Sequence, residues 1–595
     1  MAAQQTYTVC PHDCPDTCGI ITEVENGKAV KLYGNPDHPV TQGWLCAKVR
    51  PYLKRVYHPD RLRYPLKRIG PKGSNRWRRI TWGEALTEIG ERWQTIVAKY
   101  GAAAILPYSF SGTLGVVQMS VSNARFWNRL GASRLERSIC GAAAKAAVEA
   151  TLGARRNPPY ADVLNSRLIL IWGNNPVSSG PHFMTYLNHA QKAGAQVIVI
   201  DPYRSKTARG ADWHLAPRPA TDGALALGMA HVIAAENLYN ESWLNAHTIG
   251  WRQFQALLKA YSPERVAAIT GLAKEDIIKL ARLYAHMRPG LIKIADGLQR
   301  NLNGGQAVRA IAALPALTGQ YGQPGGGLFY SASGAIKWDK QVLHRWEACP
   351  PPARVVNMNR LGAALLGEVG NPPVMSLYVF GANPAVSAPN TGKVIQGLQR
   401  EDLFTVVHEL FMTDTARYAD IVLPATSQLE QTDLHKPYGH TCLAYNRQAI
   451  PPLAESKSNW ETMRLLSKAM GFDDPWLHQS PDEVIEELLQ AAAAHTPALR
   501  GVTLERLKAE GWVAVEMGVP FSDLHFPTPS GKVELYSQTL AEQGLDPLPD
   551  YLPAEDKEAI PPGASIKESP PLILLSAAAH HFTSSTFANQ ADLLA

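Results

Sequence analysis

Four cysteines near the N-terminus have the spacing of a metal-binding site. They are Cys10, Cys14, Cys18 and Cys46. The first three lie in VCPHDCPDTC, where Pro11 and Pro15 disfavour a regular helix and favour a tight loop around one centre. Four thiolates suit a 4Fe-4S cluster or a structural zinc, and three clustered cysteines with one remote partner favour the cluster. Disulfide bonds, the third interpretation, would require an oxidising compartment.

Two strand–turn–helix units have the pattern of nucleotide-binding folds. The apolar run 168–172 leads into GNNP at 173–176, and the run 376–380 leads into GANP at 381–384. Buried parallel strands carry such continuous apolar runs, and α/β folds bind nucleotides at the carboxyl ends of their strands. The first turn lacks the G-x-G-x-x-G pattern of an ordinary NAD site. We therefore predict two related Rossmann-like domains.

The chain is long enough to form several domains around these residues. It has 595 residues, of which 45% are hydrophobic and 18% charged, so three or four domains with extensive cores are expected. The formal net charge is only +6, and basic residues concentrate between Lys48 and Arg79. A solvated face or a lining for anionic phosphates explains this stretch better than a nucleic-acid surface, so no nucleic-acid partner is expected.

The N-terminal sequence and the apolar runs bear on location. MAAQQTYTV has neither a charged n-region nor an apolar h-region, and seven cysteines make an odd number for a disulfide framework. No run approaches the roughly 18 uninterrupted apolar residues of a membrane helix. We expect a cytoplasmic enzyme that is not inserted directly into a membrane.

Further motifs occur along the chain in a recognisable order. They are CAK at 46–48, HPDRLRYPLKR, ITWGEAL, WGNNP, IDPYRSKTARGADWHLAPRPATDGALALGM, NGGQAVRAIAALPALTGQYGQPGGG, FGANP, VVHELFMTDTARYADIVLPATSQLEQTD, SNWE and PSGKVELYS. With the cysteine segment, they make the chain resemble, over nearly its whole length, the molybdopterin oxidoreductases of the dimethyl sulfoxide reductase superfamily. This family holds molybdenum or tungsten between two molybdopterin guanine dinucleotides, and its members with such a cysteine segment carry a 4Fe-4S cluster.

The resemblance implies a multidomain α/β fold around a cofactor cleft. The predicted parts are a small iron–sulfur domain at 1–62, one Rossmann-like domain at 63–140 and 365–545, a second at 141–364, a linker at 546–570, and the start of a β-barrel domain at 571–595. Most of that C-terminal barrel is missing, so we expect the chain to be truncated.

The resemblance also implies roles for individual residues around the two dinucleotides. Gly173 and Asn175 would line the first phosphate turn, Asp201 would take the ribose, and Asp222 would face the guanine or its sugar. The matching residues of the second half would be Gly381, Asn383, Glu409 and Asp433. The alternative for each Asn and Asp is a turn or a helix cap.

Two further residues match positions beside the metal. Cys140 corresponds to the family's metal ligand, and a thiolate is a soft donor that suits molybdenum among dithiolene sulfurs. Lys48 corresponds to a lysine between cluster and pterin, where a buried cation would stabilise an added electron. The alternatives are a small buried hydrophobe and a surface lysine. Gly141 stands where formate dehydrogenases usually have His, which weakens a formate assignment, and Cys349 and Cys442 are expected to be structural.

The function implied is two-electron redox chemistry or oxygen-atom transfer on a small molecule. Electrons would pass through the cluster to or from an electron-transfer protein or subunit. The alternative is a non-redox hydratase or hydroxyl-transfer enzyme that uses the metal as a Lewis acid. Asp13 could serve such an enzyme as a nearby acid, although we expect it to be an exposed loop residue. An inactive truncated fragment is the third interpretation. No motif identifies the substrate.

Overall fold

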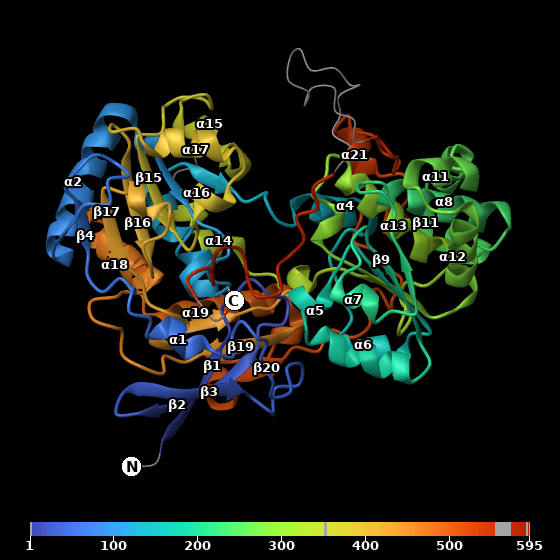
Figure 1. Ribbon diagram of the computed structural model, residues 1–595, viewed down its shortest axis with the longest axis horizontal. Helices are drawn as coiled ribbons and strands as arrows, with labels where there is room; N and C mark the ends of the chain where they lie inside the picture. Colours follow the sequence, from blue (N-terminus) through green and yellow to red (C-terminus); the bar gives the residue numbers. More distant parts are fainter. Residues whose placement is uncertain (1–2, 350–353, 554–572, 591–592, 594–595) are drawn as a thin grey trace.

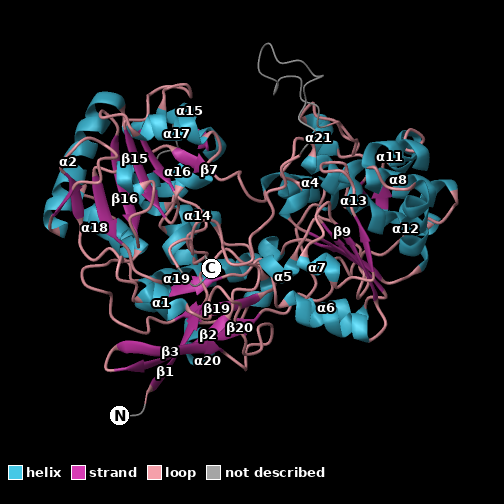
Figure 2. Cartoon of the chain, viewed as in Figure 1, coloured by secondary structure: helices cyan, strands magenta, loops and turns pink. Residues whose placement is uncertain are grey.

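The computed structural model describes residues 3–349, 354–553, 573–590 and 593. These residues form two α/β lobes that stand side by side, with a smaller region carrying the N-terminal strands at their base (Figure 1, Figure 2). This is the predicted multidomain α/β architecture with a small N-terminal domain. Within the described ranges, no helix is long and apolar enough to cross a membrane.

A six-stranded sheet forms the core of the first lobe. Its strands, in spatial order, are β5 (Trp77–Arg79), β4 (Leu66–Arg68), β17 (Ile421–Pro424), β16 (Phe404–Glu409), β15 (Ser376–Phe380) and β6 (Ile105–Tyr108). The last four are parallel, and β4 and β5 extend one edge in antiparallel fashion. The helices of this lobe include α2 (Trp82–Tyr100), α3 (Arg125–Leu130), α15 (Leu361–Leu365), α16 (Pro384–Ser387), α17 (Thr391–Leu398), α18 (Asn459–Ala469) and α19 (Pro481–His495).

A five-stranded parallel sheet forms the core of the second lobe. Its order is β10 (Trp213–Leu215), β9 (Gln196–Ile200), β8 (Leu168–Trp172), β12 (Gly290–Ile294) and β13 (Gly327–Phe329). Every residue of β8 is buried, as predicted for a strand covered on both faces. The helices include α4 (Ala142–Leu152), α5 (Pro176–Ser179), α6 (Phe183–Lys192), α7 (Lys206–Arg209), α8 (Asp222–Ala235), α9 (Glu241–His247), α10 (Trp251–Leu258), α11 (Pro263–Thr270), α12 (Lys274–His286) and α13 (Gly304–Leu317).

The N-terminal region is an antiparallel sheet of β1 (Gln4–Val9), β2 (Gly19–Glu25) and β3 (Lys28–Gly34). Val9 pairs with Gly19, so the loop with three cysteines is the connection between two paired strands. Helix α1 (Tyr52–Val56) follows Cys46. A second antiparallel sheet lies beside it, made of β18 (Asp433–His435), β19 (Cys442–Asn446) and β20 (Trp512–Ala514).

The chain passes between the lobes at positions that differ from the predicted domain limits. Strand β14 (Val355–Asn357) pairs with β7 (Arg134–Glu136), so the chain has returned to the first lobe before residue 364. Strand β21 (Val533–Glu534) pairs with β11 (Thr248–Ile249), and Phe526 lies in the second lobe's core. The segment that ends at residue 545 therefore joins the second lobe, where its apolar side chains are buried.

The C-terminal segment covers part of the N-terminal domain. Residues 573–590, where the sequence predicts the start of a β-barrel domain, form no strand in the described structure. A strand needs a neighbour for its backbone hydrogen bonds, and Ile573 and Leu574 are instead exposed. Phe587 packs into the core that contains Cys10 and Cys18. Most of the predicted linker lies outside the described residues, and the barrel domain remains a prediction.

Candidate active site

The four N-terminal cysteines face one another at the base of the two lobes. The backbone N–H of Cys10 donates to the carbonyl of Cys18 at 2.9 Å, which closes the loop. Burial, and then the proximity of Cys46, raises the pKa of Cys10 to about 12. Burial also raises the pKa of Cys18, and Cys10 and Cys14 add to the shift. Thiolates so close together need a positive centre, and bound metal deprotonates coordinating thiols.

Within the described residues, no group of three or more His, Cys, Asp or Glu side chains is placed to hold one metal ion. The choice between a 4Fe-4S cluster and a structural zinc rests on the spacing of the four cysteines, three of which lie on one loop.

Lys48 links the cysteine region to the first G-x-N-P turn. Its side chain is buried, and Nζ donates to the carbonyl of Ser178 at 3.1 Å and to that of His580 at 3.2 Å. Ser178 belongs to α5, which follows the first turn. The positive charge also lowers the pKa of Cys10, although less than burial raises it. Lys48 is therefore a buried cation, as predicted, rather than a surface lysine.

The first turn is held by one threonine. Gly173 has a φ of +57°, and a Cβ there would lie 2.7 Å from the side chain of Leu298. The hydroxyl of Thr207 donates to Asn175 Oδ1 at 2.7 Å and accepts from the N–H of Val177 at 3.3 Å. The threonine thus fixes both the asparagine and the start of α5.

The second turn repeats this arrangement. Gly381 has a φ of +54°, and a Cβ on Gly112 would lie 2.3 Å from its Cα. The hydroxyl of Thr415 donates to Asn383 Oδ1 at 2.7 Å and accepts from the N–H of Ala385 at 3.0 Å. Neither threonine was singled out from the sequence, where the only signal is their equal spacing from the two asparagines.

The acidic residues of the first half lie together. Asp201 follows β9, and Asp222 begins α8 with its carboxylate accepting from Trp172 Nε1 at 2.8 Å. Burial raises the pKa of Asp222 to about 6, and the nearby Asp201 contributes to that shift. Two adjacent carboxyl groups at the ends of β8 and β9 can accept hydrogen bonds from a ribose and a guanine.

The acidic residues of the second half have different neighbours. Glu409 ends β16, where burial raises its pKa while Arg55 and Arg61 lower it. Asp433 Oδ1 accepts from the N–H of Val117 at 2.9 Å, while Oδ2 has no partner within the described chain. Burial raises the pKa of Asp433 to about 7. The contacts of Glu409 and Asp433 therefore differ from those of Asp201 and Asp222.

Cys140 lies on the segment that crosses from β7 in the first lobe to α4 in the second (Figure 2). Its thiol donates to Asp296 Oδ2 at 3.2 Å. Asp296 Oδ1 accepts from Tyr330 Oη at 3.0 Å and from Gln299 Nε2 at 2.6 Å. Burial, and then Asp296, raises the pKa of Cys140.

Asp296 was missed in the sequence, although a signal existed. It lies two residues after the end of β12, where the rule that selects Asp201 also places acidic residues. Asp13 lies near it, because the charge of Asp296 raises the pKa of Asp13 in addition to burial. Tyr438 Oη donates to Asp13 Oδ1 at 3.2 Å. Asp13 is thus a partly buried residue facing Cys140 and Asp296 rather than an exposed loop residue.

The polar surroundings fit a large polar cofactor. Buried polar atoms without a partner in the described chain include Asn174 Oδ1, His12 Nε2, Asp433 Oδ2 and both ring nitrogens of His435. Such atoms are costly unless a bound group satisfies them. They belong to the first turn, the cysteine loop and β18.

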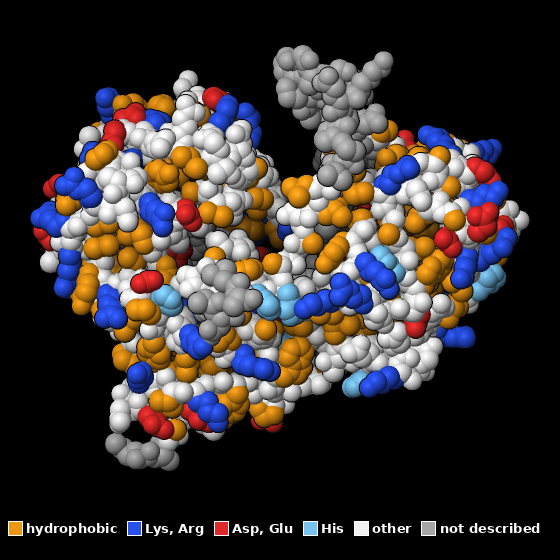
Figure 3. Space-filling model, in the orientation of Figure 1, with side chains coloured by type: hydrophobic (Ala, Val, Ile, Leu, Met, Phe, Trp, Pro, Cys, Tyr) orange, Lys and Arg blue, Asp and Glu red, His pale blue; other side chains and the backbone are white. Residues whose placement is uncertain are grey.

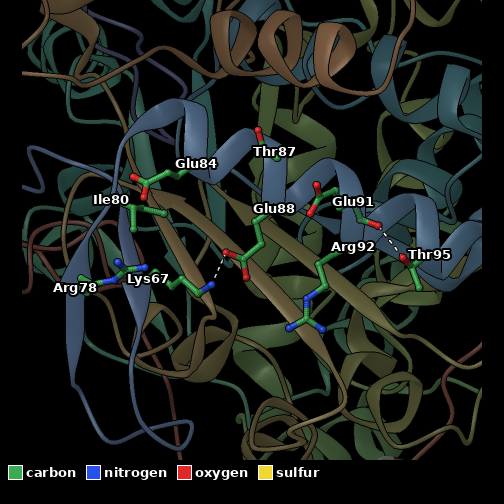
Figure 4. A pocket seen from close by; sticks show the side chains of 9 residues that line it. All are labelled: Lys67, Arg78, Ile80, Glu84, Thr87, Glu88, Glu91, Arg92 and Thr95. Carbon is green, nitrogen blue, oxygen red and sulfur yellow. Dashed lines mark hydrogen bonds and ion pairs between the residues drawn. The ribbon is translucent and has the colours of Figure 1, made fainter.

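A separate hollow of about 700 Å³ lies on the outer face of α2 and contains none of these residues (Figure 4). Its charges are mixed, and Lys67 forms an ion pair with Glu88 at 2.7 Å. Nothing in this hollow connects it with the cysteines.

Comparisons with known proteins agree with the geometry. The family described as molybdopterin oxidoreductase matches residues 61–469, and the family's Fe4S4 domain matches residues 3–58. The chain is 41% identical to the probable oxidoreductase YoaE of Bacillus subtilis, over 98% of this chain and 84% of the relative. It is 29% identical to the dimethyl sulfoxide reductase DmsA of Escherichia coli, over 92% and 76%.

A solved structure supports the same assignment. Acetylene hydratase from Pelobacter acetylenicus superposes with a TM-score of 0.78 at 26% identity, covering 92% of this chain and 79% of that one. The family match covers more than half of this chain, and its 4Fe-4S domain coincides with the four cysteines. The chain therefore belongs to the molybdopterin oxidoreductases of the dimethyl sulfoxide reductase superfamily, which carry a molybdenum or tungsten pterin and, here, a 4Fe-4S cluster.

Proposed function

We propose that Cys140 is the metal ligand of a bis(molybdopterin guanine dinucleotide) centre, and that the 4Fe-4S cluster relays electrons between this centre and a partner protein. The observation that carries the proposal is the position of the Cys140 thiol. It lies between the lobes, with Asp296 of the second lobe at 3.2 Å and Asp13 of the cysteine loop nearby. A thiolate is a soft donor that suits molybdenum or tungsten, and this segment connects the two lobes that carry the nucleotide turns.

When bound, the cofactor would supply a metal that changes its oxidation state by two electrons. The chain would hold it through the two turns and their acids, at Gly173, Asn175, Asp201, Asp222, Gly381, Asn383, Glu409 and Asp433. Lys48 would place a positive charge between the cluster and the first turn. Cys140 must lose its proton to act as a ligand, and Asp296 Oδ2 is the acceptor to which that proton is already donated.

Metal and pterin analysis tests this proposal. The purified protein is expected to contain molybdenum or tungsten, pterin with guanine nucleotide, and about four irons per chain. Its small-molecule substrate can be sought with a dye acceptor or donor among formate, thiosulfate, N-oxides, sulfoxides and oxyanions. Stoichiometric zinc without pterin would overturn the proposal.

A non-redox hydratase is the second candidate, and the position of Asp13 favours it. Its carboxyl is desolvated, its pKa is raised by burial, and it faces the region of Cys140. A carboxyl whose pKa is raised keeps its proton to a higher pH than an ordinary aspartate, and it can serve as a general acid. The similarity to acetylene hydratase adds weight. A hydratase turns over without an electron acceptor, whereas the redox enzyme stops when the acceptor is withheld.

The cytoplasmic location predicted from the sequence stays a prediction. Cell fractionation with an antibody against the protein would check it directly.

A further inference from the structure

An exposed tryptophan lies beside the cluster cysteines. Trp44 precedes Cys46 by two residues and is 37% exposed. Its indole stacks on the imidazole of His182, with ring centroids 3.8 Å apart and an angle of 22° between the planes. His182 is 1% exposed, so one ring of the stack reaches solvent and the other is buried. A large aromatic side chain exposed on one face is a typical anchor for a protein partner.

The buried ring is held in one orientation. His182 Nδ1 lies 2.9 Å from Asp16 Oδ2, and Nε2 lies 3.0 Å from the carbonyl oxygen of Trp44. These two contacts involve different nitrogens of the imidazole and together hold the ring in one orientation. The second hydrogen bond also ties the backbone of Trp44 to the ring on which its own indole stacks.

The same imidazole touches a cluster ligand. Cys18 Sγ lies 3.9 Å from Nδ1 and 4.0 Å from Nε2 of His182. The sulfur is thus nearly equidistant from the two nitrogens, so it packs against the ring. Trp44, His182 and Cys18 form an unbroken series of contacts from the surface to the cluster.

The surface around this stack favours an acidic partner. Arg50 is exposed six residues after Trp44, and the acid Asp37 is exposed seven residues before it. Lys and Arg side chains gather over α1, α5 and α7 on the face drawn in Figure 3, with few Asp or Glu among them. Complementary charge speeds encounter, and electron-transfer complexes have small interfaces.

We propose that a small acidic one-electron carrier protein docks over Trp44 and exchanges electrons with the cluster through Trp44 and His182. In the reductive direction the carrier is oxidised by one electron and the cluster is reduced by one, and two such events supply one two-electron turnover at the metal. In the oxidative direction the electrons flow outward. The inference rests on the proposed function, because it needs the cluster to act as a relay.

Stopped-flow reduction of the cluster tests the route. The probes are a reduced acidic 2Fe-2S ferredoxin and, separately, dithionite, with the cluster followed by its visible absorbance. Trp44→Ala is expected to slow reduction by ferredoxin at least tenfold and to leave reduction by dithionite nearly unchanged. Trp44→Phe restores most of the rate because it keeps an aromatic contact. Arg50→Glu slows the ferredoxin reaction and weakens its dependence on salt.

Tyr7→Ala is the matched control, since Tyr7 is 38% exposed on β1 of the same domain. It should leave both rates unchanged. A wild-type ferredoxin rate in Trp44→Ala, or equal slowing with ferredoxin and dithionite, would overturn the inference. A protein that shows no 4Fe-4S signal in electron paramagnetic resonance after reduction with dithionite overturns the proposed function and this inference together, whereas a normal signal with unchanged rates overturns the inference alone.

Discussion

The two G-x-N-P turns are alike in their backbone and unlike in their acidic residues. Thr207 follows Asn175 by the same 32 positions that separate Thr415 from Asn383, and each threonine donates to its asparagine at 2.7 Å. Both glycines after the strands have φ values near +55°, so the geometry of each turn is the same.

The acids differ because the two turns have different surroundings. Asp201 and Asp222 lie together at the carboxyl ends of β9 and β8 in the second lobe's sheet. Asp433 is instead completely buried, and its carboxylate accepts hydrogen bonds from the backbone N–H groups of Val117 and Gln118. Each of the two similar turns would therefore anchor a phosphate in the same way, whereas the acids near them would surround the two nucleosides differently. Equivalent turns do not imply equivalent ligand affinity.

The largest expected effect concerns the thiol between the two halves. If both turns serve one metal, Cys140→Ala should reduce turnover at least about a thousandfold, or about 4 kcal/mol of transition-state stabilisation. Iron content and the thermal-denaturation midpoint should stay near those of the wild type. Cys442→Ala is the matched control, because Cys442 is buried in β19 away from the turns. Wild-type activity of Cys140→Ala with metal retained would show that the ligand assignment is wrong.

The pH dependence of stability should separate the two acids. Burial raises the pKa of Asp433 to about 7 and that of Asp222 to about 6, from an ordinary value of 3.8. Each carboxyl therefore binds its proton more tightly in the folded state. This tighter binding adds to the free energy of unfolding. The contribution is complete below pH 3.8 and is lost as the pH rises through the folded-state pKa. At about 1.4 kcal/mol per pKa unit, the free energy of unfolding falls by about 4 kcal/mol for Asp433 and by about 3 kcal/mol for Asp222.

Thermal-denaturation midpoints of the cofactor-free protein between pH 4.5 and 8 measure this difference. Asp433→Asn should remove more of the pH dependence than Asp222→Asn, since the neutral amide cannot ionise. Equal effects of the two substitutions would contradict the distinction drawn between the two halves.

Gly112 packs closely against the glycine of the second turn, Gly381. Gly112→Ala places a methyl group 2.3 Å from a backbone atom, so the turn must move, at a cost of about 3 kcal/mol. Gly392→Ala in α17 is the control, because a Cβ there meets nothing within 4 Å. Unfolding temperature and guanine nucleotide content should fall for Gly112→Ala alone. Retention of both would mean that the second turn tolerates displacement.

The smallest expected effect tests what the two turns share. Thr207→Val and Thr415→Val each remove a hydroxyl that donates to the asparagine and accepts from the backbone, at a cost of about 1 to 2 kcal/mol. We expect similar losses of nucleotide content from the two variants, measured after heat extraction. A loss in one variant without the other would break the equivalence of the turns.

Local patterns carried most of the fold and part of the site. The apolar runs at Leu168 and Ser376 predicted buried strands, and the cysteine spacing predicted the cluster loop, because both depend on neighbours in sequence. Asp296 could have been found by the same rule as Asp201. The stack of Trp44 on His182 could not, since it joins residues 138 positions apart whose types are ordinary. Local patterns could not give the domain limits either. These limits depend on pairing between strands that are distant in sequence, such as that of β14 with β7.

The order of strands in the first lobe has a consequence for synthesis on the ribosome. Ser376, the first residue of β15, comes 268 residues after Tyr108, the last residue of its neighbour β6. At a synthesis rate of roughly 5 to 20 residues per second, β15 is completed roughly 15 to 50 seconds after β6, and the apolar strand β6 has no partner during this time. The second lobe's sheet needs only residues 168–329 and can close during that interval. Nascent chains should therefore expose an unpaired apolar edge and depend on chaperones before the first lobe is complete.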